Sequence, residues 1–262
     1  MRGNSHDDQQ DGTVGKALDV LDMVATAGRP LRFTEMLSVS RYPKATLYRF
    51  LQVLTNQGML SHDAESGSYT LGVRLVRLAH AAWAQSSLAP LARPHVDALS
   101  ARLGETIHLA HLDQGQVLYV DKRNAASPVE MFSQAGKVGP AYCTGVGKAM
   151  LAHLPPEALA ATLKRQSFHR FTPETLDTPA ALIAELQAIR TRGFAFDREE
   201  HEPGIICVAV PILARTGRVI GALSVTSTVA RTTLDGLAGL VPDIQATATL
   251  IAADAESWRF PG

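Results

Sequence analysis

The sequence predicts an α+β protein with two domains: a helical N-terminal domain that ends in a β-hairpin, and a larger C-terminal domain with a mostly antiparallel sheet. Three observations lead to this prediction. Residues 14–57 show helical periodicity, and residues 59–71 have the pattern of a hairpin. Strand pairs with helices segregated around them begin only after Gly104. A chain of 262 residues has room for two domains of modest size.

The composition is typical of a globular protein, with 46% hydrophobic and 19% charged residues. Every apolar run is shorter than the roughly 18 residues that a membrane helix needs, so no membrane segment is predicted. Residues 1–13 are polar and acidic, which favours a disordered leader over a signal peptide. The two cysteines, Cys143 and Cys207, provide no disulfide framework, and we therefore expect a cytoplasmic protein.

Residues 14–71 predict helix, short helix, helix and hairpin, which is the order of a winged helix-turn-helix domain. Val14–Ala27 carries apolar residues at helical spacing and ends before Gly28. The second helix is expected over Thr34–Val39 with Thr34 as its N-cap, and the third runs from Pro43, in its first turn, to about Gln57. Met59–His62 and Ser68–Leu71 are the two predicted strands.

The third helix has one apolar face and one basic face. At 100° per residue, four residues form a single apolar stripe: Leu47, Phe50, Leu51 and Leu54. The opposite face holds no acidic residue, and small side chains near its N-terminus would allow close approach to a phosphate backbone. The candidate DNA-binding residues on this face are Lys44, Ala45, Thr46, Tyr48, Arg49 and Gln52.

The local charge also favours double-stranded DNA as a partner. The whole chain has a net charge of zero, yet residues 28–60 carry five basic side chains against one acidic side chain. Arg49 and Gln52 are suited to reading base edges, whereas Lys44 is suited to contacting the backbone. Two alternatives remain open: the outer face only meets water, or the N-terminal helices mediate protein contacts.

Residues 72–86 are expected to form a linker helix between the domains. Its apolar residues cover more than one stripe, which would fit burial against a second subunit, although an ordinary core helix has the same pattern. Ser86 and Ser87 offer an N-cap for the next helix, which ends at Leu103.

The C-terminal domain, residues 87–262, alternates strand pairs with helices. The predicted strands are Glu105–Leu112, Val117–Lys122, Val129–Ser133, Phe194–Asp197, Ile205–Leu213 and Val219–Ser227. The predicted helices are Val146–Leu154, Glu157–Leu163, Pro179–Arg192 and a long final helix from Leu234 to about Glu256 that contains Pro242.

Five segments, in this order, resemble the IclR family of bacterial transcriptional regulators. They are Arg41-Tyr-Pro-Lys-Ala-Thr-Leu-Tyr-Arg-Phe-Leu51, Tyr69-Thr-Leu-Gly-Val-Arg-Leu75, Gly104-Glu-Thr-Ile-His-Leu109, Gly145-Val-Gly-Lys-Ala-Met-Leu-Ala152 and Arg192-Gly-Phe-Ala-Phe-Asp-Arg-Glu-Glu-His-Glu-Pro-Gly204. The resemblance covers roughly residues 14–250, and its co-occurring segments make it specific. Arg41 departs from the small residue that is usual there.

The resemblance implies a GAF-like effector-binding domain, a homodimer or homotetramer, and control of a catabolic operon. Effectors in the family are small organic acids. Carried over to this chain, the effector-binding residues are Met131, Gly145, Val146, Asp197, Cys207, Ser224 and Thr226, with Tyr142 and His108 as further candidates. Met131–Gly136 and Trp258–Pro261 also resemble the family's regulators of sugar-acid (2-keto-3-deoxygluconate) degradation.

No cofactor, metal or catalytic residue is predicted, although two features invite comparison with enzymes. Gly145–Lys148 suggests a phosphate-binding loop but lacks its first glycine, because Tyr142 stands there, and Ala149 replaces the Ser or Thr that would bind Mg²⁺. Cys143 could act as a thiol nucleophile with His153 or His108, which would make the C-terminal domain a ligand-binding domain with thiol-dependent activity.

The signal that the C-terminal domain senses could also be a metal or an oxidant. A regulator of the same architecture could respond to a metal held by Asp197, His201 and Cys207, or to oxidation of Cys207. The favoured hypothesis is a DNA-binding regulator in which an organic acid changes the affinity for a palindromic operator.

Overall fold

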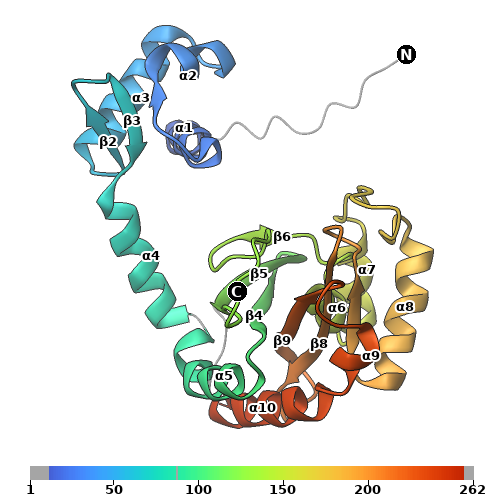
Figure 1. Ribbon diagram of the computed structural model, residues 1–262. Coiled ribbons are helices and arrows are strands. Elements are labelled where there is room, and N and C mark those ends of the chain that lie inside the picture. Colours follow the sequence, from blue (N-terminus) through green and yellow to red (C-terminus); the bar gives the residue numbers. More distant parts are fainter. Residues whose placement is uncertain (1–11, 87, 257–262) are drawn as a thin grey trace, which may run out of the picture. The chain divides into compact units, whose positions relative to one another are not determined.

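In the computed structural model, which describes residues 12–86 and 88–256, the chain divides into two compact units, Met1–Gln85 and Ser86–Gly262 (Figure 1). The predicted leader lies almost wholly outside the described residues, and Thr13 already belongs to the first helix. Among the described residues, no helix is long and apolar enough to cross a bilayer.

The N-terminal unit has the predicted order of helices and hairpin. Its elements are α1 (Thr13–Ala27), β1 (Leu31–Arg32), α2 (Phe33–Val39), α3 (Lys44–Asn56), β2 (Leu60–Asp63) and β3 (Ser68–Leu71). The three strands form an antiparallel sheet in the order β1-β3-β2. The predicted apolar stripe of α3 packs into the core, where Leu47 and Leu51 are fully buried.

Two predicted helix starts in this unit are wrong by one residue or more. Thr34 is not an N-cap, because α2 begins at Phe33, and the carboxylate of Glu35 accepts the Arg32 N–H at 2.8 Å. This is the bond that a glutamate at position N3 of a helix makes to the N–H of the N-cap residue, here Arg32. Pro43 precedes the first turn of α3 as its N-cap, with an extended ψ of 151°.

Arg41, which departs from the residue usual in the family, has a clear structural role. Its guanidinium pairs with Asp19 on α1, and the Tyr42 hydroxyl donates to the same carboxylate. The Arg41 Nε also lies 3.1 Å from the Tyr42 hydroxyl. The turn between α2 and α3 is therefore tied to α1 by side chains.

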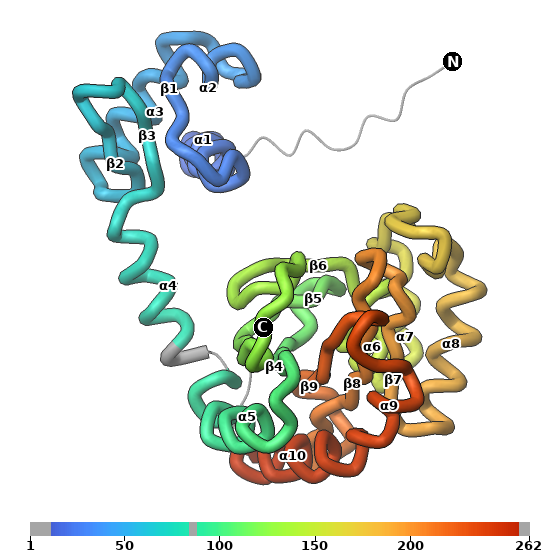
Figure 2. Tube along the Cα trace, in the orientation of Figure 1, coloured from blue at the N-terminus to red at the C-terminus, as the bar shows by residue number. Residues whose placement is uncertain are grey.

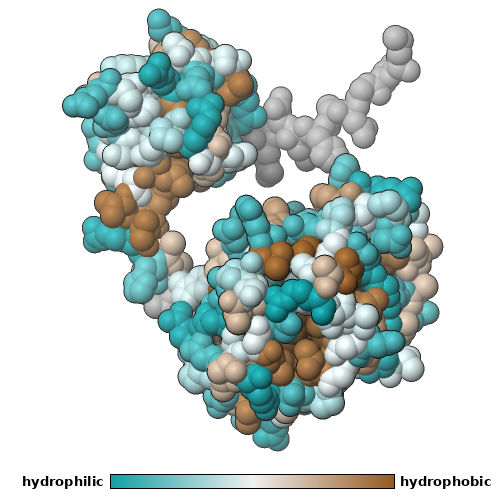
Figure 3. Space-filling view, viewed as in Figure 1, coloured by the Kyte–Doolittle hydropathy of each residue, from teal (hydrophilic) through white to brown (hydrophobic). Residues whose placement is uncertain are grey.

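The predicted linker helix is present as α4 (Val73–Ser86), and it carries unusually exposed apolar side chains. Val73, Val76 and Leu78 are 72%, 68% and 50% exposed. Figure 3 shows hydrophobic surface gathered along the part of the chain where this helix begins. At its start, Arg74 donates to the backbone and side chain of Gln57 at 3.0 and 2.8 Å. These bonds anchor the first turn of α4 to the end of α3.

The C-terminal unit is built on a six-stranded antiparallel sheet in the order β6-β5-β4-β9-β8-β7 (Figure 2). The strands are β4 (Thr106–Asp113), β5 (Gln116–Arg123), β6 (Val138–Gly139), β7 (Ala195–Arg198), β8 (Ile205–Leu213) and β9 (Val219–Thr228). The helices are α5 (Ala89–Leu103), α6 (Gly145–Leu151), α7 (Pro156–Leu163), α8 (Pro179–Arg192), α9 (Leu234–Ala238) and α10 (Val241–Asp254).

Helices cover this sheet in two groups. Figure 2 shows α5 and α10 side by side, and both contact the central strands. The other group centres on α6, which packs on β8 and β9 and against α8. Every residue of α6 is buried, including Lys148, so this short helix lies entirely inside the domain.

Three sequence predictions for the C-terminal domain need correction. Val129–Ser133 is not a strand but an irregular segment, and the third strand is the two-residue β6, which pairs with β5. The final helix is divided into α9 and α10, because the chain turns at Gly239 and Leu240, and Pro242 lies in the first turn of α10. Leu88 is the N-cap of α5 in place of the serine pair, of which Ser87 lies outside the described residues.

We expect Gly72→Ala to destabilise the N-terminal unit by about 1–3 kcal/mol, as overpacking typically does. A Cβ at Gly72 would lie 2.1 Å from the carbonyl oxygen of Gly58. Because that oxygen belongs to the backbone, it cannot avoid the Cβ by a change of rotamer. Thermal unfolding followed by circular dichroism measures the loss. Gly12→Ala is the control, since no atom lies within 4 Å of its Cβ, and equal unfolding midpoints for both variants would contradict the prediction.

Candidate functional site

The outer face of α3 presents cations with no acidic partner. Lys44, Ala45, Arg49 and Gln52 are exposed, Tyr48 is 50% exposed, and Thr46 is half-buried. Within residues 12–86 and 88–256, neither Lys44 nor Arg49 forms an ion pair. The Arg49 guanidinium lies 5.7 Å from the ring centroid of Phe50, so its stem follows the helix surface. Both charges are free to meet phosphates or base edges.

The elements around α3 hold it as a protruding helix. Tyr48 contacts Phe33 of α2 edge to face, with ring centroids 6.1 Å apart. The β2–β3 hairpin is closed by Asp63, whose carboxylate accepts from the Glu65 N–H at 2.9 Å and the Ser66 hydroxyl at 2.7 Å. Asp63 and Glu65 make the hairpin tip acidic, whereas the outer face of α3 carries the cations Lys44 and Arg49.

In the C-terminal unit, strand register brings polar side chains from four strands to one face of the sheet. Asp197 on β7 lies opposite Cys207 on β8, which lies opposite Thr226 on β9. In the adjacent row, His108 on β4 lies opposite Ser224 on β9. Because side chains two apart on a strand share a face, these two rows form one polar surface.

This surface is the floor of a cavity of about 30 Å³, which has room for about one water molecule. Six of the seven predicted effector-binding residues line it: Gly145, Val146, Asp197, Cys207, Ser224 and Thr226. The seventh, Met131, is buried outside the lining, where its neighbour Ser133 faces the cavity instead. Of the two further candidates, His108 lines the cavity, whereas Tyr142 is buried elsewhere and donates to the His169 carbonyl at 2.6 Å.

Gly145 lets the first turn of α6 approach the sheet closely. A Cβ at this position would lie 2.4 Å from the Cys207 sulfur and 3.4 Å from the Ala209 Cβ. The contacts of Gly145 with Cys207 and Ala209 therefore set the distance between α6 and the sheet at this end of the cavity. Any larger residue at 145 would displace α6 or fill the space.

A buried ion pair lies behind the cavity. The Lys148 ammonium pairs with the Glu200 carboxylate, and their side chains are 0% and 3% exposed. The Glu200 N–H donates to the Asp197 carboxylate at 2.8 Å. Burial, together with the negative charge of Glu200, raises the pKa of Asp197 to about 7. Near neutral pH this carboxyl group can either donate or accept a hydrogen bond.

His108 organises the hydroxyl groups of the floor. Its Nε2 lies 2.9 Å from the Ser133 hydroxyl, and its Nδ1 lies 3.2 Å from the Thr226 hydroxyl and 3.4 Å from that of Ser224. Burial, with the nearby charge of Lys122, lowers the pKa of His108 to about 3, so the ring is neutral. A neutral imidazole with one donor and one acceptor fixes the direction of these hydroxyl groups.

One wall of the cavity comes from residues that the sequence analysis did not name as effector-binding. Glu202 accepts the Phe132 N–H with both carboxylate oxygens at 3.0 Å, and Lys122 donates to the Ser133 carbonyl at 3.0 Å. His201 lies against the ring of Phe132, with centroids 5.0 Å apart. The remaining unpredicted lining residues are Tyr119, Ser133, Thr144, His201, Glu202 and Ile205. His201 and Glu202 stand within the Arg192–Gly204 motif, which could have indicated them.

The structure also shows how the residues named in the metal and thiol alternatives are arranged. Among the described residues, no group of three His, Cys, Asp or Glu side chains is arranged to hold a metal ion. Asp197, His201 and Cys207 therefore do not form such a group. Burial raises the pKa of both Cys143 and Cys207, which keeps the thiols protonated and unreactive. The histidines proposed as bases are engaged elsewhere, His108 by hydroxyl groups and His153 by the Ala149 carbonyl.

Comparison with protein families matches both units. Residues 13–64 match the IclR helix-turn-helix domain, and residues 80–253 match the C-terminal domain of the bacterial transcriptional regulator IclR. The resemblance indicated by the sequence motifs is therefore confirmed for both parts of the chain.

Relatives align along most of the chain. The regulator KdgR of Escherichia coli is 30% identical over 260 residues, covering 98% of this chain and 99% of that protein. The regulator XynR of the same species is 33% identical over 219 residues, covering 84% and 87%. The fold also matches an IclR homolog from Microbacterium hydrocarbonoxydans solved with 4-hydroxybenzoate, with a TM-score of 0.80, 23% identity, and coverage of 94% and 100%.

The raised pKa of Asp197 predicts a pH-dependent cost to stability. Between pH 3.8, the ordinary pKa, and about pH 7, the folded state keeps the Asp197 proton that the unfolded state has lost. The free energy of unfolding therefore falls as the pH rises through this window. Asp197→Asn should therefore stabilise the protein relative to wild type at pH 8 by a few kcal/mol, because each pKa unit corresponds to about 1.4 kcal/mol. At pH 5 the stabilisation should be much smaller. Urea unfolding at the two pH values measures this difference. The control is Asp177→Asn at an exposed carboxylate; an equal effect of Asp197→Asn at both pH values would overturn the prediction.

Proposed function

The chain belongs to the IclR family of bacterial transcriptional regulators, and we propose that it binds a palindromic operator as a homodimer or homotetramer. A small organic acid in the C-terminal cavity then changes the operator affinity. One observation carries most weight: the chain joins a helix with free cationic groups to a separate domain with a buried polar cavity. Reading DNA and sensing a small molecule are thereby divided between the two units.

The N-terminal unit supports the DNA-binding half of the proposal. Since Lys44 and Arg49 have no acidic partner among the described residues, their charge is available to the phosphate backbone or to base edges. Arg49 and Gln52 are placed one turn apart on the exposed face, the spacing with which a recognition helix reads successive base pairs. Lys44, Ala45 and Thr46 lie at the end of α3 that would approach the backbone most closely.

The exposed apolar side chains of α4 support the proposed homo-oligomer. Single exposed apolar residues are normal, but Val73, Val76 and Leu78 are clustered on one short helix. A second copy of the same helix would bury them, and a two-fold axis there would also place two α3 helices for a palindromic site.

The cavity supports a ligand with several polar groups. Ser224, Thr226 and Ser133 present hydroxyl groups, His108 is neutral, and Asp197 can carry a proton near neutral pH. This set suits an acid with additional hydroxyl or keto groups, which agrees with the relationship to KdgR and with the sugar-acid hypothesis. The IclR homolog from Microbacterium hydrocarbonoxydans was solved in complex with 4-hydroxybenzoate, which is also an organic acid.

The proposed role is not enzymatic. Both thiols are kept protonated. The imidazole of His108, which contacts the Ser133 hydroxyl, has a pKa lowered to about 3 and is therefore a weak base. A protein that reads operator DNA would act in the cytoplasm.

We expect Arg49→Ala to weaken specific DNA binding by about 1–3 kcal/mol, or roughly ten- to a hundredfold, because a base-reading arginine is lost. The probe is a duplex selected by the wild-type protein from a library of random sequences, and binding is measured by fluorescence anisotropy at fixed salt. Arg218→Ala, which removes an exposed arginine from the other unit, is the matched control. Equal affinity of both variants would show that α3 does not read DNA.

We expect an organic acid from a panel that includes sugar acids to raise the unfolding midpoint of the protein. At 100 times its dissociation constant, a ligand stabilises the folded state by about 2.7 kcal/mol. Ser224→Ala should weaken this stabilisation, because a hydroxyl group of the cavity floor is removed. Ser227→Ala is the control, since its hydroxyl lies on the other face of β9 and has no partner among the described residues. If both variants respond like wild type, the ligand binds outside the cavity.

A further inference from the structure

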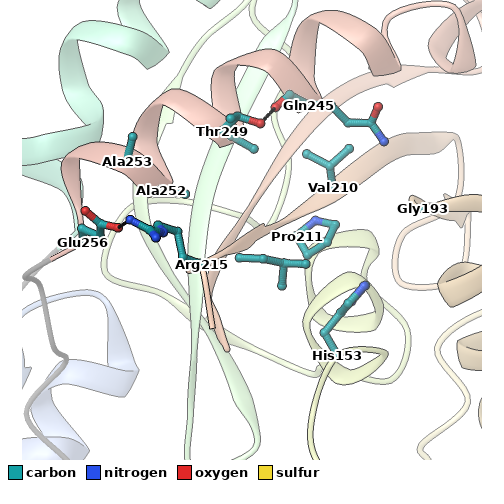
Figure 4. A pocket seen from close by; sticks show the side chains of 12 residues that line it. His153, Gly193, Val210, Pro211, Arg215, Gln245, Thr249, Ala252, Ala253 and Glu256 are labelled. Carbon is teal, nitrogen blue, oxygen red and sulfur yellow. Dashed lines mark hydrogen bonds and ion pairs between the residues drawn. The ribbon is translucent and has the colours of Figure 1, made fainter. Parts of the chain in front are cut away.

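A wide concavity between α10 and the end of β8 is an alternative to the C-terminal cavity as a place for an acid. It has a volume of about 750 Å³ and is open to the surface. Its lining includes Arg215 and Glu256, which already pair with each other at 3.0 Å (Figure 4). Their side chains are 86% and 53% exposed, so water screens both charges. An acid would therefore gain little there, and the charged groups of the C-terminal cavity decide where its carboxylate binds.

Two carboxyl groups line the C-terminal cavity, and their surroundings act on them in opposite directions. Burial and a neighbouring negative charge raise the pKa of Asp197 to about 7, so this place disfavours an anion. Burial also acts to raise the pKa of Glu202, but it is outweighed and that pKa is lowered. The groups that lower it are the side chain of His201, the N–H of Phe132 and the charge of Lys122. A carboxylate is thus stabilised on the Phe132 side of the cavity.

The place that the Glu202 carboxylate holds has the parts of an anion receptor. Both of its oxygens accept the Phe132 N–H at 3.0 Å, and one of them lies 3.7 Å from the His201 Nδ1. Lys122, which donates to the Ser133 carbonyl at 3.0 Å, brings a positive charge to the same segment. Backbone N–H groups and side-chain cations are the partners with which proteins hold carboxylates. These groups belong to other residues, so they would stay in position if the Glu202 side chain left.

Glu202 has room to leave, because it stands at the border between the cavity and the solvent. Its side chain is 30% exposed although its carboxylate lines the cavity. Turning the side chain outward would enlarge a space that now has room for about one water molecule. The same movement would free the Phe132 N–H, beside which the Lys137 ammonium lies 4.8 Å from the Phe132 ring centroid.

We propose that the Glu202 carboxylate occupies the place of the effector's carboxylate, and that an organic acid binds by displacing it. This inference rests on the proposed function, since it puts the effector in the C-terminal cavity. The carboxylate of the acid then accepts the Phe132 N–H, and its hydroxyl or keto groups lie over Ser224 and Thr226. Glu202 sets the affinity, because the acid has to compete with a carboxylate that is tethered next to its own place.

The test replaces the Glu202 carboxylate with acetate. Glu202→Ala removes one methylene and one carboxylate, which is acetate apart from one hydrogen. We expect acetate, at constant ionic strength, to raise the unfolding midpoint of Glu202→Ala and to leave that of the wild type nearly unchanged. If Glu202 holds the place for about nine-tenths of the time or more, acetate should bind the variant at least about tenfold more tightly than the wild type.

Matched controls separate charge, shape and location. Acetamide has the shape of acetate without its charge and should not stabilise Glu202→Ala. Glu130→Ala removes an exposed carboxylate two residues before Phe132, outside the cavity lining, and should not respond to acetate. Lys122→Gln, added to Glu202→Ala, keeps a donor for the Ser133 carbonyl but removes the cation, and should weaken acetate binding several-fold.

Circular dichroism shows whether each variant keeps the fold. Glu202→Gln keeps the size of the side chain but not its charge, and it takes the place of Glu202→Ala if the alanine variant does not fold. We expect it to bind acetate more tightly than the wild type does, because an amide competes less well for the neighbouring cations.

Three results would overturn the proposal: equal stabilisation of the wild type and Glu202→Ala by acetate, equal stabilisation of Glu202→Ala by acetate and acetamide, or no response of the folded Glu202 variants to acetate. Each would show that the place of Glu202 is not a receptor for a free carboxylate. The proposed function is judged by other measurements, namely the DNA affinity of Arg49→Ala and the response of the wild type to the acid panel. Its failure is therefore distinguishable from the failure of this inference.

Discussion

The buried pair of Lys148 and Glu200 is the interaction on which the C-terminal domain depends. Two charges inside a protein are stable only when they neutralise each other, and removing one partner typically destabilises a protein by about 3–5 kcal/mol. Here the pair fastens α6, whose residues are all buried, to the loop that follows β7. The same loop supplies the N–H group that holds the Asp197 carboxylate. The position of α6, the direction of Asp197 and the height of the effector cavity therefore share one ionic anchor.

The sequence alone could predict which residues share a face but not which strands lie side by side. Ser224, Thr226 and Gly145 were named because the family resemblance covers them, and the alternation of β9 is consistent with Ser224 and Thr226 sharing a face. The contribution of His108 depends on β4 pairing with β9 in a particular register, and the contribution of Asp197 depends on β7 pairing with β8. No local pattern encodes those long-range pairings, so His108 could be named only as a secondary candidate and Ser133 was not found.

Local rules failed where a side chain other than the expected one took over a structural role. Thr34 has the chemistry of an N-cap, yet Glu35 already satisfies the Arg32 N–H, and the helix starts a residue earlier. Val129–Ser133 has the composition of a strand, but Glu202 and Lys122 hold its backbone groups in place of a neighbouring strand. The faces of α3 were predicted correctly because they depend only on the helical period and on the apolar content of the chain itself.

These anchors also determine which wall of the C-terminal cavity could move to admit the proposed effector. Pockets that enclose a small ligand typically measure about 300–1,000 Å³, far above the 30 Å³ of this cavity, so a bound acid requires side chains or backbone to move. The floor is a set of paired strands, and α6 is fixed by the Lys148–Glu200 pair. The segment around Phe132 and Ser133, by contrast, is irregular, and hydrogen bonds from Glu202 and Lys122 hold it without any ladder. Since few bonds must break there, a ligand of this size would enter by displacing that segment, and it would leave the strand register and α6 unchanged.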